Sequence, residues 1–194
     1  MGEKLNPTLQ IRWTGDRVIS DIDVQGLEWI NGHIKRNAYV WWNFPVSDYV
    51  RDHMLLGPSY GLDNEANGMM SGFMSNPMEH AESSKIAIYC VADYSWNIAK
   101  YDPMNAWERA LKVIMPNNYD ALRIFAIHNS DLGPNGHGYR RDESWEVKET
   151  AKSYLDGIKN QNLSDETLMS VRKEFAEMLF ANFVNTLTPI LEIF

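Results

Sequence analysis

The chain has 194 residues, of which 44% are hydrophobic, so it is long and apolar enough to bury one proper core. Its formal net charge of −8 and sequence pI near 5.1 argue against nucleic acid or an anionic membrane as a partner, since both attract basic surfaces. No apolar run approaches the roughly 20 residues of a membrane span, and the N-terminal residues lack the apolar core of a signal peptide. The compartment is therefore unknown, and any export signal is expected upstream of this chain.

The first part of the chain predicts strands that alternate with a helix. Strands are expected over residues 8–14, 39–42 and 69–74, and the apolar run at 18–22 is either a further short strand or loop. A helix is expected over about 24–35, capped by Asp21 or Asp23, with an apolar face of Leu27, Ile30 and Ile34. A strand, a helix and a second strand in this order imply parallel pairing.

The second part of the chain is predicted to be helical. Helices are expected over residues 79–94, 103–115, 119–128, 146–159 and 165–187, and a helical turn over 49–56. The expected buried stripes are Ala81, Ser84, Ile88 and Val91 in the first of these helices and Ala106, Ala110, Val113 and Ile114 in the second. Residues 129–142 contain three glycines and a proline, which predicts a long loop, and such loops are usually functional or mobile.

Polar side chains follow the second and third predicted strands where each strand ends. Asn43 and Asp48 follow the second strand, and Asn76 follows the third. Because two consecutive parallel strands end at the same edge, we expect both asparagine amides on one rim. Amides and carboxylates bond sugar hydroxyls well. In the alternative interpretation, Asp48 only caps the turn that begins at Tyr49 and Asn76 only terminates a strand.

Trp41 and Trp42 are neighbours on a strand, so their side chains point to opposite faces. One of the two is therefore expected in the core and the other on the opposite face of the strand. Cys90, the only cysteine, is expected to be a buried small side chain within a helix. Glu79, His80 and Glu82 match no zinc signature and suit the start of a helix, so neither a metal nor a cofactor is expected.

Three strands are too few to close a barrel, which needs about eight, and they leave two edges unpaired. Each strand is nevertheless apolar enough to need cover on both faces. The simplest interpretation is that this chain forms the second part of a larger domain.

Two long and compositionally unusual runs resemble glycoside hydrolase family 84, the O-GlcNAcase-type β-N-acetylglucosaminidases. They are Trp-Trp-Asn-Phe-Pro-Val-Ser-Asp at 41–48 and Ser-Asn-Pro-Met-Glu-His-Ala-Glu at 75–82. The resemblance extends to residues 11–17, 72–85, 92–97 and 128–141 and weakens after about residue 145.

The resemblance implies a retaining, substrate-assisted hydrolysis in which the 2-acetamido oxygen of the substrate attacks the anomeric carbon. Two adjacent aspartates assist in that family, one on the acetamido group and one as general acid and base. This chain contains no Asp-Asp dipeptide, so we expect no catalytic residue in it. By resemblance, Trp41 lines the pocket around the N-acetyl group, Asn43 bonds the substrate, and Asp48 and Asn76 bond hydroxyls of the non-reducing sugar. Because Trp41 is assigned to the pocket, Trp42 on the opposite face of the strand is expected in the core.

The expected fold class is therefore α/β: a partial (β/α)8 (TIM-type) barrel with about three parallel strands, followed by a mostly helical C-terminal region. Residues 1–95 would form the C-terminal portion of the barrel and residues 96–194 the helical region. The expected function is part of an N-acetylglucosamine subsite for a glycan or glycoprotein, inactive alone. The alternative is a non-catalytic sugar-binding or assembly module, which acts through a homo-oligomer or through the missing barrel half at the exposed strand edges.

Overall fold

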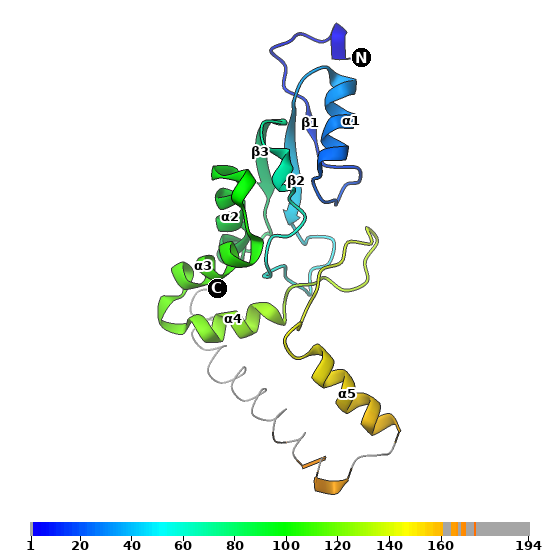
Figure 1. Ribbon diagram of the computed structural model, residues 1–194, viewed down its shortest axis with the longest axis vertical. Coiled ribbons are helices and arrows are strands. Elements are labelled where there is room, and N and C mark those ends of the chain that lie inside the picture. The colour runs from blue at the N-terminus through cyan, green and yellow to red at the C-terminus, as the bar shows by residue number, and fades with distance from the viewer. Residues whose placement is uncertain (1, 161–163, 167, 170–172, 174–194) are drawn as a thin grey trace.

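A three-stranded parallel sheet forms the centre of the protein. The computed structural model describes residues 2–160, 164–166, 168, 169 and 173. The strands β1 (Arg12–Trp13), β2 (Ala38–Pro45) and β3 (Met70–Asn76) lie in the order β1-β2-β3, and both pairings are parallel. Figure 1 shows helix α1 (Val24–Ile34) beside β1 and helix α2 (Ala81–Trp96) on the β3 side of the sheet. The predicted parallel α/β arrangement is confirmed.

Helices account for most of the chain after the sheet. They are α3 (Pro103–Ile114), α4 (Tyr119–Ile127) and α5 (Lys148–Lys159), together with short 3-10 turns at Gly2–Lys4, Asn64–Ala66, Ile98–Lys100 and Pro116–Asn118. Figure 1 shows α5 pointing away from the sheet. The helix expected over 165–187 lies mostly outside the described residues. Within the part of the chain that the structure describes, no helix is long and apolar enough to cross a membrane.

Aspartate caps define where two of the helices begin. The Asp23 carboxylate accepts from the backbone N–H of Gly26 at 2.7 Å at the start of α1. The Asp102 carboxylate accepts from the backbone N–H of Asn105 at 2.8 Å, and Pro103 occupies the first turn of α3, where its missing N–H costs nothing. Of the two capping candidates for α1, Asp23 is therefore the cap.

Several backbone segments differ from the sequence-based expectation. β2 continues through Asn43 to Pro45 and β3 continues to Asn76, so both asparagines lie in the last residues of their strands and not after them. The first strand is shorter than 8–14: only Arg12 and Trp13 pair with β2, and the Leu9 carbonyl accepts instead from the Arg36 guanidinium at 2.9 Å. Residues 49–52 form turns and a bend, and residues 53–56 have no regular structure, in place of the expected helical turn. The backbone N–H of Leu56 donates to the Asn129 carbonyl at 2.9 Å, so this bond goes to a distant segment instead of along a helix.

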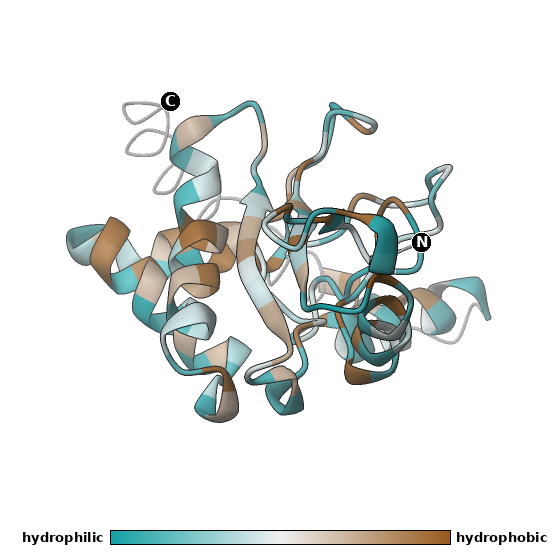
Figure 2. Cartoon of the chain, turned by 90° about the horizontal axis from the view of Figure 1, so that it is seen from above, coloured by the Kyte–Doolittle hydropathy of each residue, from teal (hydrophilic) through white to brown (hydrophobic). Residues whose placement is uncertain are grey.

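The core lies between one face of the sheet and the helices α2 and α3. Trp42 and Trp107 are the largest fully buried side chains, and Trp42 stacks on Phe44 with ring centroids 4.5 Å apart. Cys90 is buried in α2, as expected. Figure 2 shows hydrophobic and hydrophilic stretches alternating along the helices beside the sheet.

Three residues assigned to buried helical stripes are exposed, the first of them Ala81 at the start of α2. Ile88 in α2 is 45% exposed and Val113 in α3 is 65% exposed. The buried face of α3 is instead Ala106, Trp107, Ala110 and Leu111. Trp107 decides this rotation, because its indole N–H donates to the Leu56 carbonyl at 2.7 Å and its ring occupies the core.

Replacing Trp42 by alanine is expected to lower the free energy of unfolding by about 3–5 kcal/mol, because a fully buried aromatic ring is lost and a cavity remains. The same truncation of Trp96, which is 92% exposed, is expected to change it by less than about 0.5 kcal/mol. Urea denaturation followed by circular dichroism measures both. Equal effects for the two variants would contradict the placement of the core.

Candidate functional site

The candidate site lies on the face of β2 that is turned away from the helices. Alternate residues of β2 are fully buried (Ala38, Val40, Trp42, Phe44), which confirms that Trp42 belongs to the core. Tyr39, Trp41 and Asn43 project from the other face and are half-buried. The period of two along a strand thus separates a packing face from a face that carries polar and aromatic groups.

Three of the four candidate residues are joined by hydrogen bonds. The indole N–H of Trp41 donates to the side-chain oxygen of Asn43 at 2.9 Å, and the side-chain N–H of Asn76 donates to the same oxygen at 3.0 Å. The Asn43 amide nitrogen in turn donates to the Val18 carbonyl at 2.6 Å. The prediction that both asparagine amides share one edge of the sheet is confirmed.

The remaining hydrogen-bonding capacity of this group is small and well defined. The Asn43 oxygen accepts two bonds, which uses both of its lone pairs, and one of its two N–H donors is used on Val18. This leaves one N–H on Asn43, and one N–H and the oxygen on Asn76, for any further partner. A ligand at this edge would therefore meet both donors and an acceptor, the combination that a hydroxyl or an acetamido group requires.

Arg12 also belongs to this face, and sequence reasoning missed it. Its guanidinium lies over the Trp41 ring, 5.1 Å from the ring centroid, at a distance typical of a cation–π contact. Arg12 pairs with Tyr39 in the ladder, so Arg12, Tyr39 and Trp41 share one face. Knowledge of the strand register would have been needed to place Arg12 on this face, because the register is what puts Arg12 beside Tyr39.

Asp48 lies near this group but makes no contact with it. It is exposed and sits in the turn just beyond β2, and no hydrogen bond among the described residues joins it to Trp41, Asn43 or Asn76. The backbone N–H of Val46 donates to the Asn76 carbonyl at 2.9 Å. Two residues span at most about 7 Å, so the backbone of Asp48 stays close to the end of β3. Its carboxylate is free to accept two hydroxyl groups.

Tyr49, the next residue, is half-buried, and its pKa is affected by the charge of Asp48. Burial, and after it the Asp48 carboxylate, raise the pKa of the Tyr49 phenol to about 12, because both disfavour the phenolate. The Tyr49 ring also meets the His137 ring edge to face, with centroids 4.8 Å apart. The turn after β2 therefore contacts residues far along the chain, which no local pattern indicated.

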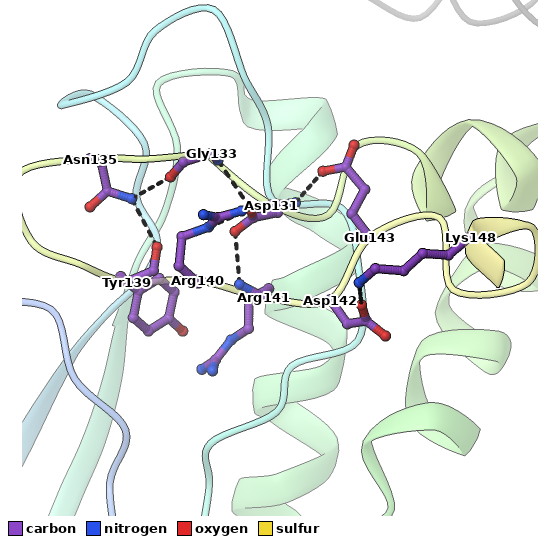
Figure 3. Close-up of polar contacts among 9 residues, drawn as sticks. All are labelled: Asp131, Gly133, Asn135, Tyr139, Arg140, Arg141, Asp142, Glu143 and Lys148. Atoms are coloured by element: carbon purple, nitrogen blue, oxygen red, sulfur yellow. Dashed lines mark hydrogen bonds and ion pairs between the residues drawn. The ribbon is translucent and has the colours of Figure 1, made fainter. Parts of the chain in front are cut away.

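Residues 129–142, here called the Asp131 arm, supply that contact through His137. Figure 3 shows the polar contacts of Asp131 within this arm. The arm has no helix or strand, as predicted, but Asp131 orders it. The buried Asp131 carboxylate accepts from the backbone N–H groups of Gly133 at 3.2 Å and Arg141 at 2.8 Å, and from the Arg140 side chain at 2.7 Å. Burial alone would raise the Asp131 pKa, but these donors outweigh it and hold that pKa below its usual value.

No group of three or more His, Cys, Asp or Glu side chains suited to a metal ion occurs among the described residues. The His80 Nε2 atom lies 3.9 Å from a carboxylate oxygen of Glu79, and Glu82 forms an ion pair with Lys85. Glu79 precedes α2 and is exposed, whereas Glu82 lies in its first turn and is half-buried.

Comparison with known proteins matches the family model for β-N-acetylglucosaminidase over residues 1–127. The protein O-GlcNAcases of Rattus norvegicus and Mus musculus are each 34% identical to this chain over 95 residues, which is 48% of this chain and 10% of each relative. The chain thus spans about a tenth of the length of these curated relatives.

Solved structures match almost the whole chain. The structure of CpGH84D superposes with a TM-score of 0.83 and 30% identity over 94% of this chain and 31% of that one. A mutant of the O-GlcNAc hydrolase of Thermobaculum terrenum gives a TM-score of 0.77 and 25% identity, and covers 93% of this chain and 38% of that one. The three parallel strands and their helices correspond to part of the barrel of these enzymes. This chain therefore belongs, as a partial domain, to the β-N-acetylglucosaminidases of glycoside hydrolase family 84.

Proposed function

We propose that this chain supplies part of the N-acetylglucosamine subsite of a retaining, substrate-assisted β-N-acetylglucosaminidase. The observation that supports this proposal most is the hydrogen-bonded group of Trp41, Asn43 and Asn76 at the carboxyl ends of two neighbouring parallel strands. In α/β barrels this end of the strands carries the active site. Residues 1–95 would belong to the barrel and residues 96–194 to a helical region that follows it.

Each residue has a role that its free atoms allow. Trp41 would line the space around the N-acetyl group, since its indole N–H is already used and its ring is held by Arg12. Asn43 would donate its remaining N–H to the substrate, and Asn76 would both donate to and accept from one hydroxyl. Asp48 would accept from hydroxyls of the non-reducing sugar through charge-assisted bonds. Because Asn43 is already oriented by the protein, little ordering would be lost on binding.

The chemistry of the proposed reaction needs groups that this sequence does not contain. An aspartate would orient the 2-acetamido group so that its oxygen attacks the anomeric carbon. A second aspartate would protonate the leaving oxygen and later activate water. Adjacent aspartates do not occur in the chain. We therefore propose that the 194 residues bind sugar without turning it over.

The purified chain is expected to show no turnover of a fluorogenic N-acetylglucosaminide above the uncatalysed rate. A general acid alone is worth about 10²–10⁴ in rate, and the carboxylate that assists the acetamido group is absent as well. Measurable turnover that disappears in Asp48→Ala would mean that a catalytic acid lies in this chain.

N-acetylglucosamine is expected to bind with a dissociation constant in the millimolar range at best, because only part of the subsite is present. Asp48→Asn should weaken binding by about tenfold, the order expected for loss of a charged acceptor. Asp52→Asn, which removes the same charge from an exposed residue nearby, is the matched control and should leave the affinity unchanged. Titration followed by ligand-observed NMR measures all three proteins; equal effects of the two substitutions would contradict the proposal.

The unpaired edges of the sheet favour a second candidate, an assembly module. Among the described residues, β1 pairs only with β2, and β3 pairs only with β2. Each outer strand therefore presents backbone groups to which another chain can add, either a second copy or one that carries the remainder of a barrel.

If the chain assembles with itself in this way, light scattering should give a mass of at least two 22.4 kDa chains. Ser71→Lys, which places a charge at an exposed position of β3, should then shift the protein towards the monomer. A monomer mass for the unmodified protein would exclude self-association through these edges and leave the sugar-binding proposal unaffected.

A further inference from the structure

The tip of the Asp131 arm is held in a fixed shape by its own side chains. The Asn135 amide donates to the carbonyls of Gly133 at 2.9 Å and Tyr139 at 2.8 Å, and its oxygen accepts from the backbone N–H of His137 at 3.0 Å. Figure 3 shows how Asn135 bridges the two sides of the arm while Asp131 closes its base. The segment is therefore ordered without a helix or a strand.

At the base of the arm, Arg141 forms hydrogen bonds to the segments that follow β1 and β2. The Arg141 guanidinium donates to the Asp21 carboxylate at 2.6 Å and to the Tyr60 carbonyl at 3.1 Å, and it lies 4.3 Å from the centroid of the Tyr139 ring. A Cβ at Gly61 would lie 2.1 Å from the Asp21 carboxylate oxygen, so only glycine lets the backbone pass this ion pair. Because the arm is fixed at its base, its tip can hold another segment.

The segment that the tip holds is the turn after β2. His137 meets Tyr49 edge to face, with an interplanar angle of 83°. Neither ring nitrogen of His137 forms a hydrogen bond within the described part of the chain, so the imidazole acts on Tyr49 through ring contact. Tyr49 directly follows Asp48, whose own carboxylate has no hydrogen-bond partner there that could orient it.

We propose that the Asp131 arm positions Asp48. In this proposal His137 packs against Tyr49 and thereby holds the turn that carries the Asp48 carboxylate. His137 is a positioning residue that acts through Tyr49, and the comparison of alanine and phenylalanine variants below distinguishes this role from direct contact with the sugar. The contact between arm and turn is independent of any ligand; its consequence for sugar binding rests on the function proposed above.

Hydrogen–deuterium exchange of residues 46–52 in the full chain tests the contact. In His137→Ala the exchange of this turn is expected to become about two- to tenfold faster, the range for loss of one aromatic pair. His137→Phe keeps an aromatic ring at the tip and is expected to restore the slower exchange. His80→Ala, at an exposed histidine at the start of α2, is the matched control and should leave the turn unchanged.

The affinity for N-acetylglucosamine separates positioning from direct contact. His137→Ala should weaken binding two- to tenfold, and His137→Phe should return it to the wild-type value, because phenylalanine replaces the ring contact but not a hydrogen bond. Unchanged exchange in His137→Ala, or a phenylalanine variant that behaves like the alanine variant in both measurements, would overturn the proposal. If the unmodified chain binds no sugar while the exchange results hold, the proposed function fails and the positioning role of the arm stands.

Discussion

The hydrogen bond between Asn76 and Asn43 depends on the register of two parallel strands. Trp41 lies opposite Met74 and Trp42 opposite Ser75, and after an irregularity between Trp42 and Pro45 the last pair joins Pro45 to Asn76, which keeps the Asn76 side chain within reach of Asn43. A shift of one residue would turn every side chain of β3 to the other face and separate the two amides. Gly72 allows this pairing, because a Cβ there would lie 2.3 Å from the Tyr39 ring. The candidate site therefore exists only because the sheet is in this register.

The same register restricts what the site can bind. The Asn43 oxygen is saturated by Trp41 and Asn76, and one of its N–H groups is held by the Val18 carbonyl, so its orientation is set by the protein before any ligand arrives. A small number of free donors and acceptors remains, at defined places. Pre-organisation of this kind improves affinity by removing the cost of ordering the side chains on binding, and it explains why an asparagine is more useful here than a freely rotating polar residue.

The Asp131 arm shows how a segment without regular secondary structure is ordered by a buried charge. A carboxylate that leaves water must be surrounded by donors, and Asp131 recruits them from Gly133, Arg140 and Arg141. Meeting this requirement fixes the path of the arm, and the Arg141 guanidinium then connects the arm to Asp21 and to the Tyr60 carbonyl. One buried carboxylate thus links segments that follow different strands.

Local patterns in the sequence determined the helices, the strands and the residue types at the strand ends, because periodicity, caps and proline act over a few residues: Asp23, one of the two predicted caps, begins α1, and Trp41 and Trp42 lie on opposite faces of β2. The short β1, the irregular segment at 49–56 and the rotation of α3 accompany contacts with distant partners, namely Arg36, Asn129 and Leu56. Only the tertiary structure brought Arg12 over Trp41 and His137 against Tyr49, since these contacts depend on strand register and on the path of a long arm. Neither is encoded within a window of neighbouring residues, and a sequence pattern of period two or 3.6 carries no information about which distant side chain will complete a site.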